Sequence, residues 1–301
     1  MTADSWIVVA GHPEIGNLIA AARSLGGKVS AVVAGPRSLA ELVAAGGVDR
    51  VVWFGEPGQV PVEAYGAAVS ATVGAAPGTL FGGRHPSERV LLGAAAAGLQ
   101  APVLTGAHSI SVEDDQVVVT HAVYGGIADE TVAITGPVAL MLDGGSIPTA
   151  TGSTVVDEVA VVPLAMRVTG TKPSAFEEVE LGSASRVVGV GRGLRTQEGL
   201  VLIEDLARAL EAEVACSRPL AEGLNWMGKD RYIGISGQHI APQLYFAIGI
   251  SGQLQHMAGV REAETIVAIN SDPSAPVFQD ADYGIVGDLY EIVPAITRAL
   301  K

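Results

Sequence analysis

The chain has 301 residues, of which 49% are hydrophobic and 17% charged, so it can bury the core of one large domain or two ordinary ones and is not expected to be disordered. Its 18 Lys and Arg against 32 Asp and Glu give a net charge of -14, which argues against binding to nucleic acid or an anionic membrane surface, because both would repel the chain. A single cysteine, Cys216, excludes an intramolecular disulfide and fits a reducing compartment.

The first half of the chain alternates short β-branched runs with amphipathic stretches, a pattern typical of a parallel sheet with crossover helices. The predicted strands are residues 7–10, 29–34, 51–54, a strand around Leu80, 102–104 and 138–142, and the predicted helices are residues 14–25, 38–45, 61–73 and 86–98. Alternating runs around Ile110, at 117–120 and at 131–134 are separated by turn-forming residues, so we expect hairpins added to this sheet.

Residues 144–186 are polar and rich in Gly, Pro and Thr, with strand-like pieces at 158–163 and 176–181, and we place the domain boundary near Ser185. Beyond it the alternation restarts. The predicted strands are residues 186–190, 213–216, 244–250, 265–270 and 283–286, and the predicted helices are 197–212, 253–259 and 289–300. We therefore predict an α/β protein with two parallel-sheet domains, residues 1–185 and 186–301, of which the second is a doubly wound sheet.

The start of the chain lacks a basic segment followed by an apolar run, and the longest apolar runs, such as residues 90–99, are too short to span a bilayer. We expect no secretory leader, no membrane insertion and a cytoplasmic location.

Two glycine-rich segments resemble phosphate-binding loops. Gly189-Val190-Gly191-Arg192-Gly193 lies between a predicted strand and helix, where backbone amides can meet a phosphate. The dinucleotide fingerprint is incomplete, because Leu194 stands where a third glycine is required, and a purely structural turn is the alternative. Residues 223–229 are followed by Asp230 instead of Ser or Thr, so the magnesium-binding hydroxyl is missing and a nucleotide triphosphatase is rejected.

Residues 249–256, Gly-Ile-Ser-Gly-Gln-Leu-Gln-His, are the richest polar stretch and follow a buried-looking strand. Ser251 and the amides near Gly252 can hold a diphosphate, while Gln255 and His256 can offer donors to a ring. Other polar groups follow neighbouring predicted strands: Ser217, Arg218, Ser236, Gln238, Asn270 and Asp288. Because an open α/β sheet binds ligands at the carboxyl ends of its strands, we expect a site there, although each residue alone is also explained as a turn or cap residue.

Residues 249–256, 265–270 and 281–289 strongly resemble, in order and spacing, the signature of the electron-transfer flavoprotein alpha subunit. Three more segments resemble blocks of that family: Gly191-Arg192-Gly193-Leu194, Ser217-Arg218 and Pro242-Gln243-Leu244-Tyr245. The resemblance is therefore tight from about Val187 to Leu300. It is looser in the first half, at Gly83-Arg84, Tyr124-Gly125-Gly126 and Thr131-Val132. The chain departs from many relatives at Ile235. It also departs at His121, where relatives often have Arg, and at Ile127, where they often have Asn.

The resemblance implies a subunit that pairs with a homologous beta subunit through its first domain and holds FAD in residues 186–301. It implies electron transfer from donor dehydrogenases, such as acyl-CoA dehydrogenases, to a quinone oxidoreductase or a ferredoxin-type acceptor, with electron bifurcation left open. The implied FAD-binding residues are Arg192, Ser217, Arg218, Ser236, Gly237, Gln238, Ser251, Gly252, Gln255, His256, Asn270 and Asp288. Carried-over roles put Arg218 against the isoalloxazine, Ser236 near N5, His256 near the C2 carbonyl, Ser251 at the diphosphate, and Asn270 with Asp288 at the adenosine.

Two other classes of function compete with this interpretation. One is a stand-alone cofactor-dependent enzyme on a related sheet, but the six histidines are dispersed and no metal-ligand spacing stands out. The other is a regulatory module that binds an adenine nucleotide without redox work, which would be colourless. The sequence favours the flavoprotein and leaves the module open.

Overall fold

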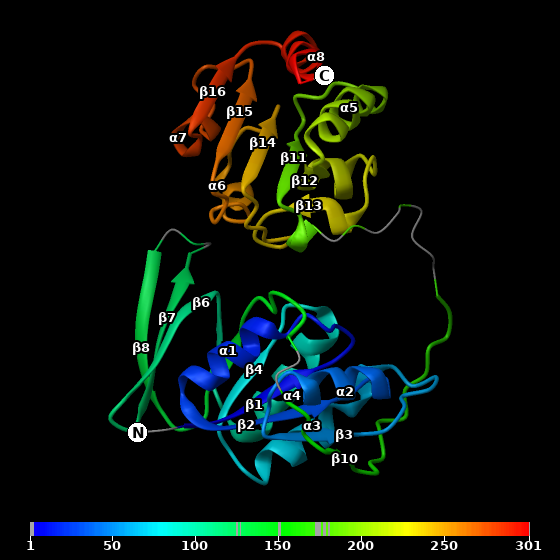
Figure 1. Ribbon diagram of the computed structural model, residues 1–301, viewed down its shortest axis with the longest axis vertical. Coiled ribbons are helices and arrows are strands. Elements are labelled where there is room, and N and C mark those ends of the chain that lie inside the picture. Colours follow the sequence, from blue (N-terminus) through cyan, green and yellow to red (C-terminus); the bar gives the residue numbers. More distant parts are fainter. Residues whose placement is uncertain are drawn as a thin grey trace. The chain divides into compact units, whose positions relative to one another are not determined.

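The computed structural model describes residues 3–124, 126, 128–149, 152–171, 176, 179 and 181–300 (Figure 1). The chain divides into two compact units, residues 1–171 and 172–301. The described residues form two parallel sheets and one antiparallel sheet, with helices between the parallel strands. This confirms the predicted α/β class with two parallel sheets. The functions assigned to the two predicted domains stay predictions at this point.

The first unit is built on a parallel sheet with the strand order β10-β3-β2-β1-β4-β9-β5. Its strands are β1 (Ala3–Val9), β2 (Gly26–Val33), β3 (Arg50–Trp53), β4 (Thr79–Gly82), β5 (Val103–Thr105), β9 (Ala139–Met141) and β10 (Val156–Glu158). Its helices are α1 (Gly16–Ser24), α2 (Arg37–Ala45), α3 (Gly66–Gly74) and α4 (Pro86–Leu99). Strand β1 is apolar on both faces because helices cover both sides of the sheet.

The two faces of this sheet belong to different cores. Ile7 and Val9 of β1 pack with α1 and α2, whereas Trp6 and Val8 pack with α3 and α4. Successive side chains of a strand point to opposite faces, so one continuous apolar run supplies both layers.

The predicted hairpins do not extend the parallel sheet, and that expectation is wrong. Strands β6 (Ala107–Glu113), β7 (Gln116–Val123) and β8 (Ala128–Thr135) form their own antiparallel sheet (Figure 1). Val117 and Val119 of β7 are buried against the core that contains α1 and α2, so this sheet packs by its face instead of pairing by its edge. Gly125 and Ile127, singled out in the sequence, lie outside the described residues.

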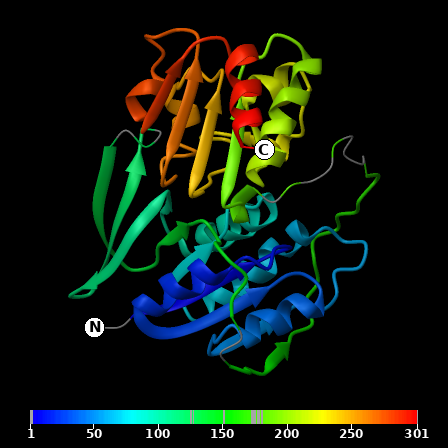
Figure 2. The ribbon, with the colours of Figure 1, turned by 45° about the horizontal axis from the view of Figure 1, so that its top comes forward.

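The second unit is built on a parallel sheet with the strand order β13-β12-β11-β14-β15-β16. Its strands are β11 (Arg186–Val190), β12 (Glu213–Ser217), β13 (Tyr232–Ile233), β14 (Leu244–Ile248), β15 (Ile266–Asn270) and β16 (Tyr283–Val286). Its helices are α5 (Leu200–Leu210), α6 (Leu254–Met257), α7 (Val277–Asp280) and α8 (Leu289–Ala299). Helices α5 and α8 lie side by side on one face, and α6 and α7 cover the other (Figure 2).

Several predicted elements differ in detail. The predicted helix 61–73 opens with a 3-10 turn, η1 (Val62–Tyr65), before α3, which is common at helix starts. The predicted strand 158–163 is wrong except at Glu158, the last residue of β10, which pairs with Trp53 at the end of β3; residues 159–163 are not in a strand. The predicted strand 176–181 is not a strand at its described positions, where Phe176 lies in a bend and Leu181 begins a 3-10 turn, η2 (Leu181–Ser183).

Sequence patterns missed short elements: β13, α7 and a π-helical turn, η4 (Pro219–Gly223). Within the described residues no helix is both long enough and apolar enough to cross a membrane.

The carboxyl-end crevice of the first sheet is filled by the protein itself. Between β1 and β4, Glu88 of α4 is buried and its Oε1 accepts a hydrogen bond from the Ala10 amide at 3.4 Å. Its other oxygen occupies the place where a Cβ on Gly83 would lie. Burial raises the pKa of Glu88 to about 8, against the opposing effect of the Ala10 amide, so this carboxyl is neutral near pH 7.

Glu88 should make the stability of the first unit depend on pH. Because its folded pKa lies above its unfolded value, the folded state keeps a proton that the unfolded state releases between about pH 4.5 and about pH 8. The unfolding free energy should therefore fall with rising pH by up to about 1.4 kcal/mol per pH unit from this group. In Glu88→Gln this contribution is absent, so its stability relative to the unmodified chain should increase across the same window.

Urea unfolding followed by the fluorescence of the buried Trp6 and Trp53 measures this difference. Glu41→Gln, which changes an exposed α2 carboxylate paired with Arg37, is the control and should give no pH-dependent difference. A constant stability gap between Glu88→Gln and the unmodified chain at every pH would contradict the assignment.

Candidate functional site

The centre of the second sheet is a topological switch point. Strands β11 and β14 are neighbours, and the chain proceeds from β11 outward through β12 and β13, but from β14 outward through β15 and β16. The turns that leave the carboxyl ends of β11 and β14 therefore diverge, and this strand order is the one that binds dinucleotides across the resulting crevice. The described residues contain no group of three His, Cys, Asp or Glu arranged for a metal ion.

The glycine turn after β11 packs directly on the turn after β14. The Gly191 amide donates to the Ile248 carbonyl at 2.9 Å, and the Gly193 amide donates to the Gly249 carbonyl at 3.0 Å. A Cβ on Gly191 would lie 2.4 Å from the Gly249 oxygen, so only glycine fits. The turn thus has a structural role in joining the two strands, and Arg192 in it is exposed. Whether the turn also contacts a phosphate stays a prediction.

The 249–256 stretch forms a tight loop that ends in one helical turn. Gly252 has φ +80°, and a Cβ there would lie 2.1 Å from the Val277 nitrogen. The Ser251 carbonyl accepts from the Val277 amide at 3.1 Å, while the Ser251 and Gln255 side chains are exposed. Helix α6 has only four residues, so the loop amides, more than a helix dipole, are what this segment offers to an anion.

His256 is buried in α6, with 8% of its surface exposed. Its Nε2 lies 2.7 Å from the hydroxyl of Tyr245 in β14. Its Nδ1 is also buried and makes no hydrogen bond of normal geometry with any described residue. Burial lowers the pKa of His256 to about 4, which the backbone of Ile233 offsets only in part, so the imidazole is neutral near pH 7.

Ser217 and Arg218 lie at the end of β12, where Arg218 precedes η4. The Arg218 Nε pairs with Glu222 Oε2 at 2.6 Å, and Glu222 also pairs with Lys229 at 3.4 Å. Glu222 raises the pKa of the exposed Arg218 guanidinium, so this group is a permanent cation. Its side chain is 64% exposed, which leaves it accessible to a ligand.

The loop after β13 carries Ser236, Gly237 and Gln238 and is fixed by its own backbone. The Gly237 amide donates to Gly234 at 2.8 Å, and the Gln238 amide donates to Tyr232 at 2.8 Å. The Tyr232 hydroxyl donates to Ser236 Oγ at 2.8 Å. The Ile235 amide donates to the Gln255 carbonyl at 2.8 Å, so this loop and the 249–256 loop are held together.

Asn270 and Asp288 follow β15 and β16 and support the same edge. Asn270 Nδ2 donates to the Ile250 carbonyl at 2.8 Å. Asp288 caps α8 by accepting from the Tyr290 amide at 2.9 Å, and its second oxygen lies 3.2 Å from an Arg195 guanidinium nitrogen. Both side chains therefore have structural partners, and their predicted contacts with an adenosine stay predictions.

These contacts join the glycine turn after β11, the 249–256 loop, the loop at 236–238 and Asn270 through Ile248, Gly249, Ile250 and Gln255. They do not include Ser217, Arg218 or Asp288, which have partners of their own or are placed only by the ends of their strands. Sequence reasoning missed Tyr245 and Tyr232 as supporting residues. The sequence feature that could have indicated Tyr245 is the small size of Gly189 and Ala247, which leave room on the sheet for its ring.

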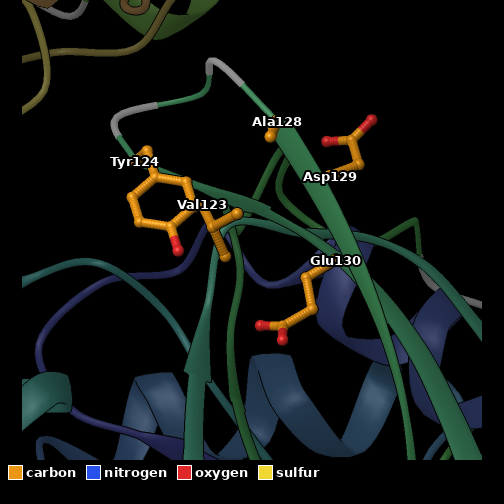
Figure 3. A pocket seen from close by; sticks show the side chains of 5 residues that line it. All are labelled: Val123, Tyr124, Ala128, Asp129 and Glu130. Atoms are coloured by element: carbon orange, nitrogen blue, oxygen red, sulfur yellow. The ribbon is translucent and has the colours of Figure 1, made fainter.

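The first unit contains a shallow hollow at the end of the β7–β8 hairpin, lined by Val123, Tyr124, Ala128, Asp129 and Glu130 (Figure 3). Its two carboxylates are paired with imidazoles: Asp129 lies 3.1 Å from His108, and Glu130 lies 3.4 Å from His121. Each carboxylate of the hollow thus has an imidazole from the same antiparallel sheet beside it.

The strand order, the glycine contacts and the buried Nδ1 of His256, which makes no hydrogen bond of normal geometry among the described residues, fit a dinucleotide cofactor in the second unit. Fold and site thus define a doubly wound α/β protein with a dinucleotide crevice. Residues 180–261 match the electron transfer flavoprotein FAD-binding domain, and residues 12–165 match the electron transfer flavoprotein domain.

Among curated relatives, the protein FixB of Escherichia coli O157:H7 and that of Shigella flexneri are each 36% identical over 306 residues, covering 98% of this chain and 97% of the relative. FixB of Escherichia coli strain 55989 is 45% identical over 209 residues, covering 67% of each chain. The chain belongs to the electron-transfer flavoprotein alpha subunit family, and its cofactor is FAD.

One solved structure that was matched is a protein from Mycobacterium smegmatis described as thiamin diphosphate-dependent. The match covers 98% of this chain and 60% of the other chain, at 11% sequence identity. Its TM-score of 0.25 is too low to carry an argument.

Gly252→Ala should disrupt the loop that carries Ser251 and His256. The substitution forces a Cβ into the Val277 backbone at a positive φ, so we expect the second unit to lose roughly 1–3 kcal/mol or more of stability, and FAD with it. Gly182→Ala is the control, because a Cβ at this exposed position would meet nothing within 4 Å. Equal stability and flavin content in the two variants would refute the role of Gly252.

Proposed function

We propose that this chain is the FAD-carrying subunit of a heterodimeric electron carrier, which accepts electrons from dehydrogenases and passes them to a downstream acceptor. The observation that carries the proposal is the switch-point crevice in a unit that matches the electron transfer flavoprotein FAD-binding domain. Acyl-CoA dehydrogenases are the expected donors, and a quinone oxidoreductase or a ferredoxin-type protein is the expected acceptor, in the cytoplasm. The segment Gly252-Gln253-Leu254-Gln255-His256-Met257 resembles the branch of the family linked to nitrogen fixation or carnitine metabolism, and we propose that the chain belongs to that branch.

We propose that the site residues of the second unit bind different parts of the FAD. Bound FAD would supply a ring that accepts and releases electrons one at a time. The loop at Ser251 and Gly252 would hold the diphosphate with Arg192, and Asn270 and Asp288 would hold the adenosine end. Ser217, Gly237, Gln238 and Gln255 would line the crevice between these groups.

Three side chains are proposed to face the flavin ring. Arg218 would place its guanidinium against the ring, Ser236 its hydroxyl near N5, and His256 a neutral N–H donor near the C2 carbonyl. A cation and a donor directed at the region that gains negative charge favour the reduced ring over the oxidised ring, and so raise the potential.

The first unit is proposed to dock the beta subunit. Its segment 159–168 exposes large apolar side chains at alternate positions: Val162, Leu164, Met166 and Val168. The segment is anchored to its own unit where the Leu164 amide donates to the Ala64 carbonyl at 3.0 Å. An exposed apolar row of this kind is typical of a protein interface.

Co-expression with a beta-type subunit from the same genome tests the proposal. We expect the two chains to purify together and to show flavin absorbance that bleaches on anaerobic stepwise reduction. One flavin per heterodimer would identify a simple carrier, and two would favour bifurcation, with the second held by the partner. A folded, colourless complex that takes up no added FAD would refute the proposal and favour an adenine-nucleotide-binding module.

Arg218 and Glu222 should shift the flavin potential in opposite directions. Arg218→Ala removes the proposed cation and should lower the midpoint by tens of millivolts, whereas Glu222→Gln removes the anion that opposes it and should raise the midpoint. Spectroelectrochemistry of the flavin-loaded heterodimer measures both. Arg208→Ala, which deletes an exposed α5 cation paired with Asp205, is the control. Unchanged midpoints in the first two variants, with FAD bound, would remove Arg218 from the ring.

A further inference from the structure

Tyr245, which is not among the proposed flavin contacts, lies next to His256. Tyr245, in the central strand β14, has no exposed surface, and its hydroxyl is 2.7 Å from His256 Nε2. The two ring centroids are 6.1 Å apart and tilted by 35°, so the contact is made through the polar atoms and not by stacking.

The space around this hydroxyl is built into the sheet. A Cβ on Gly189 in β11 would lie 2.1 Å from the Tyr245 hydroxyl oxygen, so a side chain at 189 would displace it. Val187 and Ala215 belong to the same apolar cluster as the Tyr245 ring, and the buried Cys216 thiol has its pKa raised by burial to about 12 and stays neutral. The Tyr245 ring is therefore surrounded by buried apolar side chains, and the charges that act on the neighbouring Cys216 are those of Arg231 and Asp230.

In this environment the direction of the hydrogen bond can be assigned. Burial raises the pKa of Tyr245 and lowers that of His256, so both groups are neutral and one proton lies between oxygen and nitrogen. Among the described residues, His256 is the one side chain that hydrogen-bonds the Tyr245 hydroxyl. If Nε2 carried the proton, the phenolic O–H would be buried without an acceptor, at the cost of an unsatisfied polar group. Tyr245 therefore donates, Nε2 accepts, and the ring proton is on Nδ1.

We propose that Tyr245 is a positioning residue that fixes the tautomer and orientation of His256, so that Nδ1–H is the donor this imidazole offers to the flavin. The proposal rests on the proposed function, since it concerns the same FAD site. Nδ1 is buried and makes no hydrogen bond of normal geometry among the described residues; the Ile233 backbone, which raises the pKa of the ring, is the one protein group that competes with a ligand for this proton. The same logic applies to metal-bound histidines, whose second nitrogen is fixed by an outer hydrogen bond.

Nitrogen NMR of the heterodimer with labelled histidine tests the tautomer. Before FAD is added, His256, assigned by its loss in His256→Gln, should show a protonated Nδ1 and an unprotonated Nε2. In Tyr245→Phe, which keeps the ring and removes the hydroxyl, Nε2 should become protonated in all or part of the molecules. An unchanged His256 signal in Tyr245→Phe would overturn the positioning role, whether or not the complex binds FAD.

A double-mutant cycle on FAD binding tests the coupling. Tyr245→Phe should weaken FAD binding by about tenfold in the unmodified background and hardly at all in His256→Gln, because the hydroxyl acts through the imidazole. Tyr283→Phe, on the exposed edge strand β16, is the control and should leave binding unchanged. Equal losses in both backgrounds would show that Tyr245 only supports packing, whereas no FAD uptake by the unmodified heterodimer would refute the proposed function itself.

Discussion

The close approach of the turns after β11 and β14 is the constraint on which the site depends. Their backbones meet through the amides of Gly191 and Gly193 and the carbonyls of Ile248 and Gly249, with no room for a Cβ. The remaining polar groups are attached to this junction: Asn270 holds the Ile250 carbonyl, and the Ser236 loop is tied to Gln255 through Ile235. Backbone contacts thus position the site, and the side chains left exposed by them are available to the cofactor.

The two parallel sheets share a strand order but differ in what lies at the carboxyl ends of their central strands. The order β3-β2-β1-β4 in the first unit matches β13-β12-β11-β14 in the second. In the first sheet the buried, neutral Glu88 lies at the carboxyl ends of β1 and β4 and accepts from the Ala10 amide. In the second sheet the equivalent edge presents the exposed Arg192, Ser251 and Gln255. A single fold can therefore provide a closed scaffold in one unit and a cofactor site in the other.

Much of this arrangement could be predicted from the sequence, because it depends on local patterns. Apolar periodicity located most helices and strands, and parallel strands bring the segments around Arg218, Ser251 and Asn270 to one edge. The antiparallel sheet could not be placed, since packing of Val117 and Val119 on the core depends on tertiary contacts. The Tyr245–His256 pair was missed for a similar reason: it depends on the space left by Gly189 on the neighbouring strand.

The central claim is that the second unit holds FAD at the switch point of its sheet. A crystal structure of the heterodimer grown with FAD tests it most directly. We predict electron density for the dinucleotide at the carboxyl ends of β11 and β14, with the diphosphate beside Ser251 and Gly252. Density for FAD confined to the partner subunit, with this crevice filled by ordered water, would contradict the account.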